Sequence, residues 1–115
     1  MIDLIYLLSL LHNISNDEYK FNLVDAYIEA ETNYTYYYWA RPQAEYLKDS
    51  RGDCTDKALL KCAILRQQGI PCGAVTGYKH NIQRPENKHA WIMARINDTW
   101  VSSEPELKPL WAGAQ

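Results

Sequence analysis

The chain has 115 residues, which is enough for one domain and too few for two. About 47% of the residues are apolar, so a small hydrophobic core can form. The net charge is −2 and both signs are interspersed, which argues against a nucleic-acid-binding surface. We therefore expect residues 1–115 to form a single domain that does not act on nucleic acid.

The first predicted element is an apolar helix over residues 1–11, because Ile2, Ile5, Leu8 and Leu11, together with Leu4 and Leu7, give helical spacing over a broad apolar face. The segment is too short to span a membrane, and it lacks the positively charged start of a signal peptide. We expect a core helix, with contact to a partner as the alternative.

A second helix is predicted to begin at Ser15, since Ser15 and Glu18 form a capping-box pattern, and to run to about Ala30. The region 31–39 is rich in Tyr and Thr and is predicted to be extended or irregular. Its dense run of tyrosines suits a core, a cleft or an interface. A short helix is expected over 42–48, because proline tolerates the first helical position.

The most informative stretch is Arg51-Gly52-Asp53-Cys54, which precedes a strongly apolar segment. Asp53 is a good N-cap, and Asp56 three residues later completes a capping-box pattern. Gly69 is placed for a C-terminal cap. These signals predict a deeply buried helix over 54–68.

After this helix the pattern changes to strands. Strands are predicted over 72–78, 89–96 and 99–103, with a polar loop over 79–88 and a two-residue hairpin turn at Asn97-Asp98. Helices are thus followed by a small antiparallel sheet, with the helix at 54–68 as the central one. The predicted fold class is α+β.

The three cysteines, Cys54, Cys62 and Cys72, cannot form a closed disulfide framework because their number is odd. None of the spacings is that of a structural zinc site, so we expect no metal or cofactor. At least one thiol should be free, which slightly favours a cytoplasmic location or a catalytic thiolate. Cys62 and Cys72 are interpreted as small buried hydrophobic residues.

Cys54 is the candidate nucleophile. It lies at the start of a buried helix, where unpaired N–H groups and the helix dipole favour the thiolate and can hold an oxyanion. Gly52 is expected to let the chain turn and to leave space for a substrate. Packing alone is the alternative role for Cys54.

A cysteine nucleophile needs a base, and the chain has three histidines. His12 is expected at the surface, whereas His80 lies in the polar loop and stays a second choice. His89 begins a strand after a loop and is preferred. The hairpin turn would place Glu104 opposite about position 91, so Glu104 can orient His89.

These residues resemble the transglutaminase-like superfamily of papain-type cysteine enzymes. The resemblance covers about residues 39–105. It runs from Arg51-Gly52-Asp53-Cys54-Thr55-Asp56-Lys57-Ala58-Leu59-Leu60 through Leu65-Arg66-Gln67-Gln68-Gly69-Ile70-Pro71 and Val75-Thr76-Gly77-Tyr78 to His89-Ala90-Trp91 and Trp100 to Glu104-Pro105. It implies a transglutaminase-like core with a Cys–His–acid triad.

The resemblance places the nucleophile at Cys54, the base at His89 and the acid at Glu104, where the family usually has Asp. It also implies an upstream polar or aromatic side chain that completes the oxyanion hole. Gln43 is the better candidate for that role, because its amide can donate, and Trp39 is the second.

Three functions follow from this interpretation. The first is a hydrolase that cleaves an amide, peptide or isopeptide bond through an acyl-enzyme. The second is a transglutaminase-type acyltransferase, which shares the chemistry up to the acyl-enzyme, and the third is a binding module without turnover. A peptide or protein substrate is expected. Because the chain is short for the family, either the groove is open or a second copy in a homo-oligomer completes it.

Overall fold

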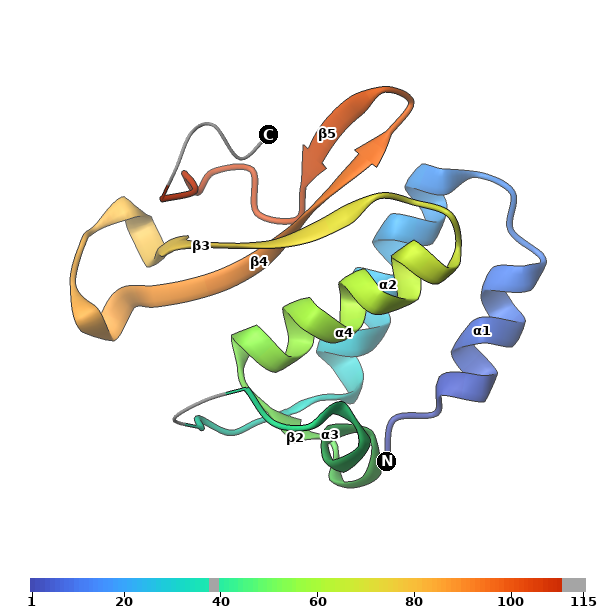
Figure 1. The fold of residues 1–115 in the computed structure, drawn as a ribbon, viewed down its shortest axis with the longest axis horizontal. Coiled ribbons are helices and arrows are strands. Elements are labelled where there is room, and N and C mark those ends of the chain that lie inside the picture. The colour runs from blue at the N-terminus through green and yellow to red at the C-terminus, as the bar shows by residue number, and fades with distance from the viewer. Residues whose placement is uncertain (38–39, 111–115) are drawn as a thin grey trace.

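The computed structural model describes residues 1–37 and 40–110. The predicted α+β class is confirmed, with helices that precede a three-stranded antiparallel sheet (Figure 1). The elements are α1 (Leu4–His12), α2 (Asp17–Glu31), β1 (Asn33–Tyr34), α3 (Gln43–Asp49), β2 (Arg51–Gly52), α4 (Cys54–Gln67), β3 (Cys72–Tyr78), η1 (Lys79–Asn81), η2 (Pro85–Asn87), β4 (Lys88–Ile96) and β5 (Thr99–Ser102).

Helix α4 is the centre of the molecule. It packs against β3 and β4 and also against α2, while α1 lies at the outer edge next to α2 (Figure 1). No helix in the described ranges has both the length and the apolar character that a membrane crossing requires.

The two faces of β4 have different partners, because successive side chains of a strand point to opposite faces. The residues that join the main core with α4 are Ala90, Ile92, Ala94 and Ile96. Trp91 lies on the other face and forms a second cluster with Val75 and Leu107. His89 has the same parity as Trp91, and the two rings stack with centroids 5.9 Å apart.

Both ends of α4 follow the predicted signals. The Asp53 carboxylate accepts hydrogen bonds from the N–H groups of Thr55 (3.0 Å) and Asp56 (3.2 Å), and the Asp56 carboxylate accepts from the Asp53 N–H (3.1 Å). At the other end, Gly69 has φ of 81° and begins the exit from the helix. The nucleophile candidate is therefore the first residue of a helix that is capped at both ends.

The predicted start of the second helix was one residue early. Asn16, not Ser15, is the N-cap of α2, and its side chain accepts a hydrogen bond from the Tyr19 N–H at 2.8 Å. Asn and Ser are about equally good N-caps, so side-chain preference alone does not separate Asn16 from Ser15.

A short parallel pair was not predicted. Strand β1 pairs with β2, with Tyr34 opposite Gly52, and the Thr35 N–H donates to the Gly52 carbonyl at 2.8 Å. Gly52 also does not leave space for a substrate: a methyl group there would lie 2.9 Å from Asp56 Cβ and 3.0 Å from the Tyr46 ring. The glycine instead allows the chain just before Cys54 to pack tightly.

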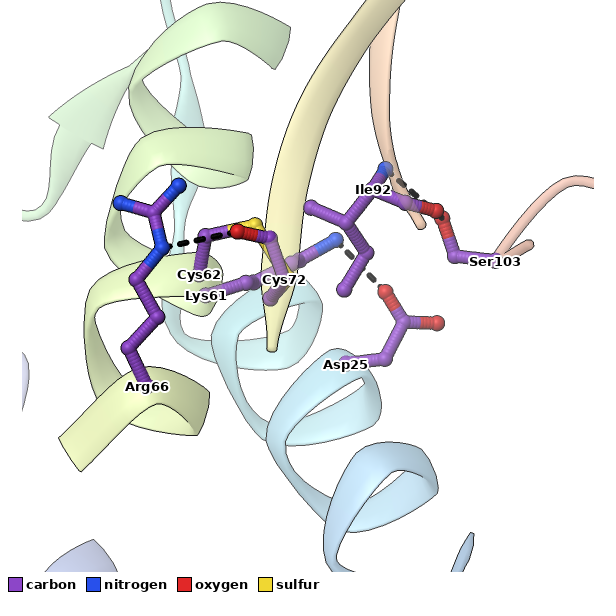
Figure 2. The surroundings of a disulfide bond; sticks show 7 residues. All are labelled: Asp25, Lys61, Cys62, Arg66, Cys72, Ile92 and Ser103. Atoms are coloured by element: carbon purple, nitrogen blue, oxygen red, sulfur yellow. Dashed lines mark hydrogen bonds and ion pairs between the residues drawn. A yellow bond between two sulfur atoms is a disulfide. The ribbon is translucent and has the colours of Figure 1, made fainter. Parts of the chain in front are cut away.

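Cys62 and Cys72 are buried as expected, but they are not separate hydrophobic residues. They form a disulfide between α4 and the first residue of β3, with Cα atoms 5.2 Å apart (Figure 2). The Arg66 Nε donates to the Cys72 carbonyl at 2.8 Å across the same junction. Because Cys54 is then the only free cysteine, the cysteine count no longer favours a reducing compartment.

We expect reduction of this disulfide to lower the melting temperature by about 10 °C. The bond closes a short loop, with a sequence separation of 10, and a loop of this size contributes about 2–3 kcal/mol to the free energy of unfolding. Thermal unfolding with and without dithiothreitol measures the effect. A Cys62→Ala/Cys72→Ala variant is the control, since its melting temperature should not respond to the reductant. A thiol titre of three in the unreduced, denatured protein would contradict the prediction.

Candidate active site

The structure brings Cys54 and His89 together, although 35 positions separate them in the sequence. Cys54 is the first residue of α4 and is half-buried, and His89 is the second residue of β4. Both line the same two cavities, and each acts on the pKa of the other. A thiol at a helix start thus faces an imidazole from the neighbouring strand.

The two nitrogens of the His89 ring have different surroundings. Nε2 lies 2.5 Å from Oε2 of Glu104. The buried Nδ1 has no hydrogen-bond partner of ordinary geometry among the described residues. Because Nε2 faces Glu104, Nδ1 is the nitrogen available to the Cys54 sulfur. Cys54 is also the group with the largest effect on the pKa of His89.

The pKa values of the two side chains shift in opposite directions. Burial raises the pKa of the Cys54 thiol, but the neighbouring His89 imidazole and the Ala90 N–H outweigh it, and the net effect lowers that pKa. The neighbouring Cys54 thiol, opposed by burial and supported by Glu104, raises the pKa of His89. Both shifts favour a thiolate–imidazolium pair.

The register of the hairpin explains why Glu104 reaches His89. Met93 pairs with Ser102 across β4 and β5, which extrapolates to position 104 opposite position 91, as the turn predicted. Strand β5 ends at Ser102, and the Ser102 hydroxyl accepts a hydrogen bond from the Glu104 N–H at 3.1 Å. The Glu104 side chain, which is one methylene longer than that of aspartate, then extends back to the His89 ring.

The start of α4 offers fewer oxyanion donors than the sequence suggested. The Asp53 carboxylate already binds the N–H groups of Thr55 and Asp56. The N–H of Cys54 is the first of the helix, and no described residue accepts a hydrogen bond from it. A single backbone donor is therefore free beside the sulfur.

Two cavities share Cys54, His89 and Ala90 in their walls. One has a volume of about 290 Å³ and extends along α4 toward Asp25 and Glu29 of α2. The other is larger, about 460 Å³, and its wall includes three tyrosines, Tyr34, Tyr36 and Tyr37. The Cys54–His89 pair is thus reached from two sides.

Ion pairs line the smaller cavity and connect α2 to α4. Lys57 Nζ lies 2.8 Å from Glu29, and Lys61 Nζ lies 2.8 Å from Asp25 and 2.5 Å from Glu29. The lysine side chains are 15% and 7% exposed, whereas Glu29 is 47% and Asp25 is 32% exposed. This wall therefore presents mainly carboxylates to solvent, a feature that sequence reasoning missed because it depends on how α2 packs.

The remaining candidates are placed as follows. Gln43 is exposed at the start of α3 and lines neither cavity that contains Cys54. Trp39 lies outside the described residues. His12 is exposed at the end of α1, and His80, in η1, lines a neighbouring cavity together with His89. Among the described residues, no three His, Cys, Asp or Glu side chains are grouped as metal ligands.

The chain belongs to the transglutaminase-like superfamily, because the model of that family matches residues 8–105. No protein of curated function matches the chain significantly. The match includes the predicted motif region and extends into the N-terminal helices, which carried no family motif by inspection.

Solved structures share the fold. A candidate cysteine protease from Cytophaga hutchinsonii superposes with a TM-score of 0.69 and 25% identity, over 79% of this chain and 32% of that one. A candidate protease from Parabacteroides distasonis gives 0.65 and 17%, over 91% and 23%. The periplasmic domain of TgpA from Pseudomonas aeruginosa, bound to ethylmercury, gives 0.53 and 22%, over 80% and 45%.

The chain spans about a third of the Cytophaga protein and less than half of the other two. The likeness of the latter two concerns the fold alone.

Proposed function

We propose that this protein is a cysteine-nucleophile hydrolase that cleaves an amide, peptide or isopeptide bond through an acyl-enzyme on Cys54. His89 transfers protons and Glu104 orients the imidazole. The observation that carries the proposal is the pairing of a half-buried thiol with an imidazole at the point where two cavities meet.

In the first half of the reaction, the Cys54 sulfur attacks the carbonyl carbon and forms a tetrahedral oxyanion. The oxyanion then collapses, and the bond between carbon and nitrogen breaks. His89 donates its proton to the leaving nitrogen, so a neutral amine departs and a thioester remains on Cys54. The raised pKa of His89 supports this step, because it keeps the proton available.

In the second half, water attacks the thioester while neutral His89 accepts a proton from the water. The bond between carbon and sulfur breaks, the carboxylic acid leaves, and Cys54 returns as the thiolate with protonated His89. An acyltransferase would use an amine in place of water. The cavities on both sides of Cys54 suit a chain that continues past the scissile bond, as a peptide does.

The fold of the neighbouring structures also supports the proposal. The Cytophaga protein is described as a candidate cysteine protease, at 25% identity to this chain.

The pKa of Cys54, which is lowered by His89 and Ala90, suits a nucleophile that reacts near neutral pH.

The test uses p-nitrophenyl acetate as a generic acyl donor, with the full chain kept free of reductant. We expect a rapid release of one equivalent of nitrophenolate and the mass gain of one acetyl group, which peptide mapping assigns to Cys54. Acetate should then be released by hydrolysis. Addition of a lysine-containing peptide tests transfer, and we expect acetate to stay the main product.

Two outcomes would oppose the proposal. If Cys54 is acetylated no faster in the folded protein than in the denatured protein, the chain is a binding module and not an enzyme. If the lysine peptide is acetylated in preference to water, the chain is an acyltransferase.

A further inference from the structure

We propose that Trp91 is a positioning residue of the site, whose indole ring stacks on the His89 imidazole and stabilises its protonated form. The same contact fixes the plane of the imidazole, which must present one nitrogen to Cys54 and the other to Glu104. This inference rests on the proposed function, because protonated His89 is the group that donates to the leaving nitrogen. Trp91 acts through His89 and transfers no proton itself.

The two rings lie on one face of β4. Trp91 follows His89 by two residues, so both side chains point to the same side of the sheet. Their ring centroids are 5.9 Å apart, and the ring planes differ by 27°. This distance is within the range of a cation–π interaction, for which indole is the best partner among the aromatic side chains. The stack therefore favours imidazolium over neutral imidazole.

Strand β3 leaves the space that the indole needs. Gly77 is directly opposite His89 in the antiparallel ladder, and Trp91 is opposite Val75. A methyl group on Gly77 would lie 2.6 Å from Cη2 of Trp91 and 2.6 Å from the Lys108 carbonyl oxygen. The six-membered ring of the indole thus leans across the position opposite His89, where another residue would place its side chain.

Packing, not a hydrogen bond, holds the indole in this position. Trp91 is 2% exposed and forms a cluster with Val75 and Leu107. Its buried N–H has no hydrogen-bond partner among the described residues. An unpaired buried donor lowers the free energy of unfolding. Contact with the imidazolium gives the indole a role that a purely apolar side chain in this cluster would not have.

Two charged groups act directly on the His89 ring. Cys54 from α4 and Glu104 from the segment after β5 raise the pKa of His89, whereas burial lowers it. On the β3 side the opposite residue is Gly77, which brings no charge. Other charged side chains share a cavity with His89, namely Asp25 and Glu29 of α2, Asp53, Lys57 and Lys61 of α4, Lys79 and His80 of η1, Glu86 of η2, Lys88 of β4 and Glu106 after β5. A substitution at Trp91 changes none of these charges, so a change in the pKa of His89 reports on the indole.

The test titrates His89 by NMR in the full chain with Cys54→Ala, so that no thiol titrates beside the ring. The Hε1 signal of His89 is assigned by its loss when His89→Gln is added. For Trp91→Leu we expect the midpoint pH to fall by about 0.5 to 1 unit, and for Trp91→Phe by less. Water admitted beside a smaller side chain would instead raise the midpoint, because burial lowers the pKa of His89. The sign therefore separates the stacking contact from a change in burial.

Two glycines of β3 provide a matched pair of variants. Gly77→Ala displaces the indole while Trp91 itself is unchanged, so it should also lower the midpoint of His89. Gly73→Ala should leave the midpoint unchanged, since a methyl group there meets nothing within 4 Å. Val75→Ala controls for packing in the cluster, and we expect it to lower the melting temperature without moving the midpoint.

The inference is overturned if both Trp91 variants leave the midpoint of His89 unchanged or raise it. It is also overturned if Gly73→Ala lowers the midpoint as much as Gly77→Ala does. With Cys54 present, Trp91→Leu should slow acylation by p-nitrophenyl acetate at pH 7 by about threefold or more, and an unchanged rate would deny Trp91 a part in the reaction. Titration of His89 needs no turnover. If the midpoint falls as expected but the wild type does not acylate, the stacking contact stands and the proposed hydrolysis falls.

Discussion

Replacement of Cys54 by alanine is expected to lower acyl transfer by a factor of about 10⁴ or more while the fold is retained. The sulfur provides the bond to the substrate. Among the described residues that line the two cavities, Ser103 is the other cysteine or serine, and its hydroxyl is hydrogen-bonded to the backbone of Ile92. Position 54 is the first residue of α4 and is half-buried, so the free energy of unfolding should change by about 1 kcal/mol or less.

The measurement is the burst of nitrophenolate together with the melting temperature. The Cys62→Ala/Cys72→Ala variant is a matched control, because it loses two sulfur atoms but keeps the thiol at position 54. That variant should still give the burst, although it melts at a lower temperature. Undiminished acyl transfer by Cys54→Ala would remove Cys54 from the reaction.

The parts of the fold that could be predicted have strong local signals. The helix at α4 follows from Asp53, Asp56 and Gly69, which fix its two ends through hydrogen bonds within a few residues. The hairpin between β4 and β5 follows from Asn97 and Asp98, whose φ values are 52° and 63°. Because this turn sets the register, the position of Glu104 next to His89 was also predictable.

The features that could not be predicted depend on packing between distant segments. A two-residue ladder such as β1–β2 has no periodicity, so no sequence pattern indicates that Tyr34 lies beside Gly52. The disulfide depends on how β3 folds back over α4, which an odd cysteine count does not reveal. The charged wall formed by Asp25 and Glu29 depends on the rotation of α2 against α4.

Replacement of His89 by glutamine is expected to move the pH dependence of Cys54 alkylation to higher pH. In the wild type, alkylation should rise as the pH passes the lowered pKa of Cys54, because the thiolate is the reactive form. Without the imidazole, burial of the sulfur is opposed only by the Ala90 N–H among the main causes, so the pKa of the thiol increases. The alkylation rate at pH 6 should then fall by about threefold or more, because a smaller fraction of Cys54 is thiolate. The higher nucleophilicity of a more basic thiolate offsets only part of this loss.

Iodoacetamide labelling from pH 5 to pH 10 gives the midpoint pH of Cys54 alkylation. This midpoint reports the pKa of the thiol more directly than a rate at one pH. Only Cys54 reports, because Cys62 and Cys72 are bonded to each other, and glutathione serves as the reference thiol. Glu104→Gln should lie between the wild type and His89→Gln. The amide oxygen of Gln can still accept from Nε2, but without the carboxylate charge the pKa of His89 falls and the thiolate–imidazolium pair is less stable. Equal midpoints for the wild type and His89→Gln would show that the imidazole does not ionise Cys54.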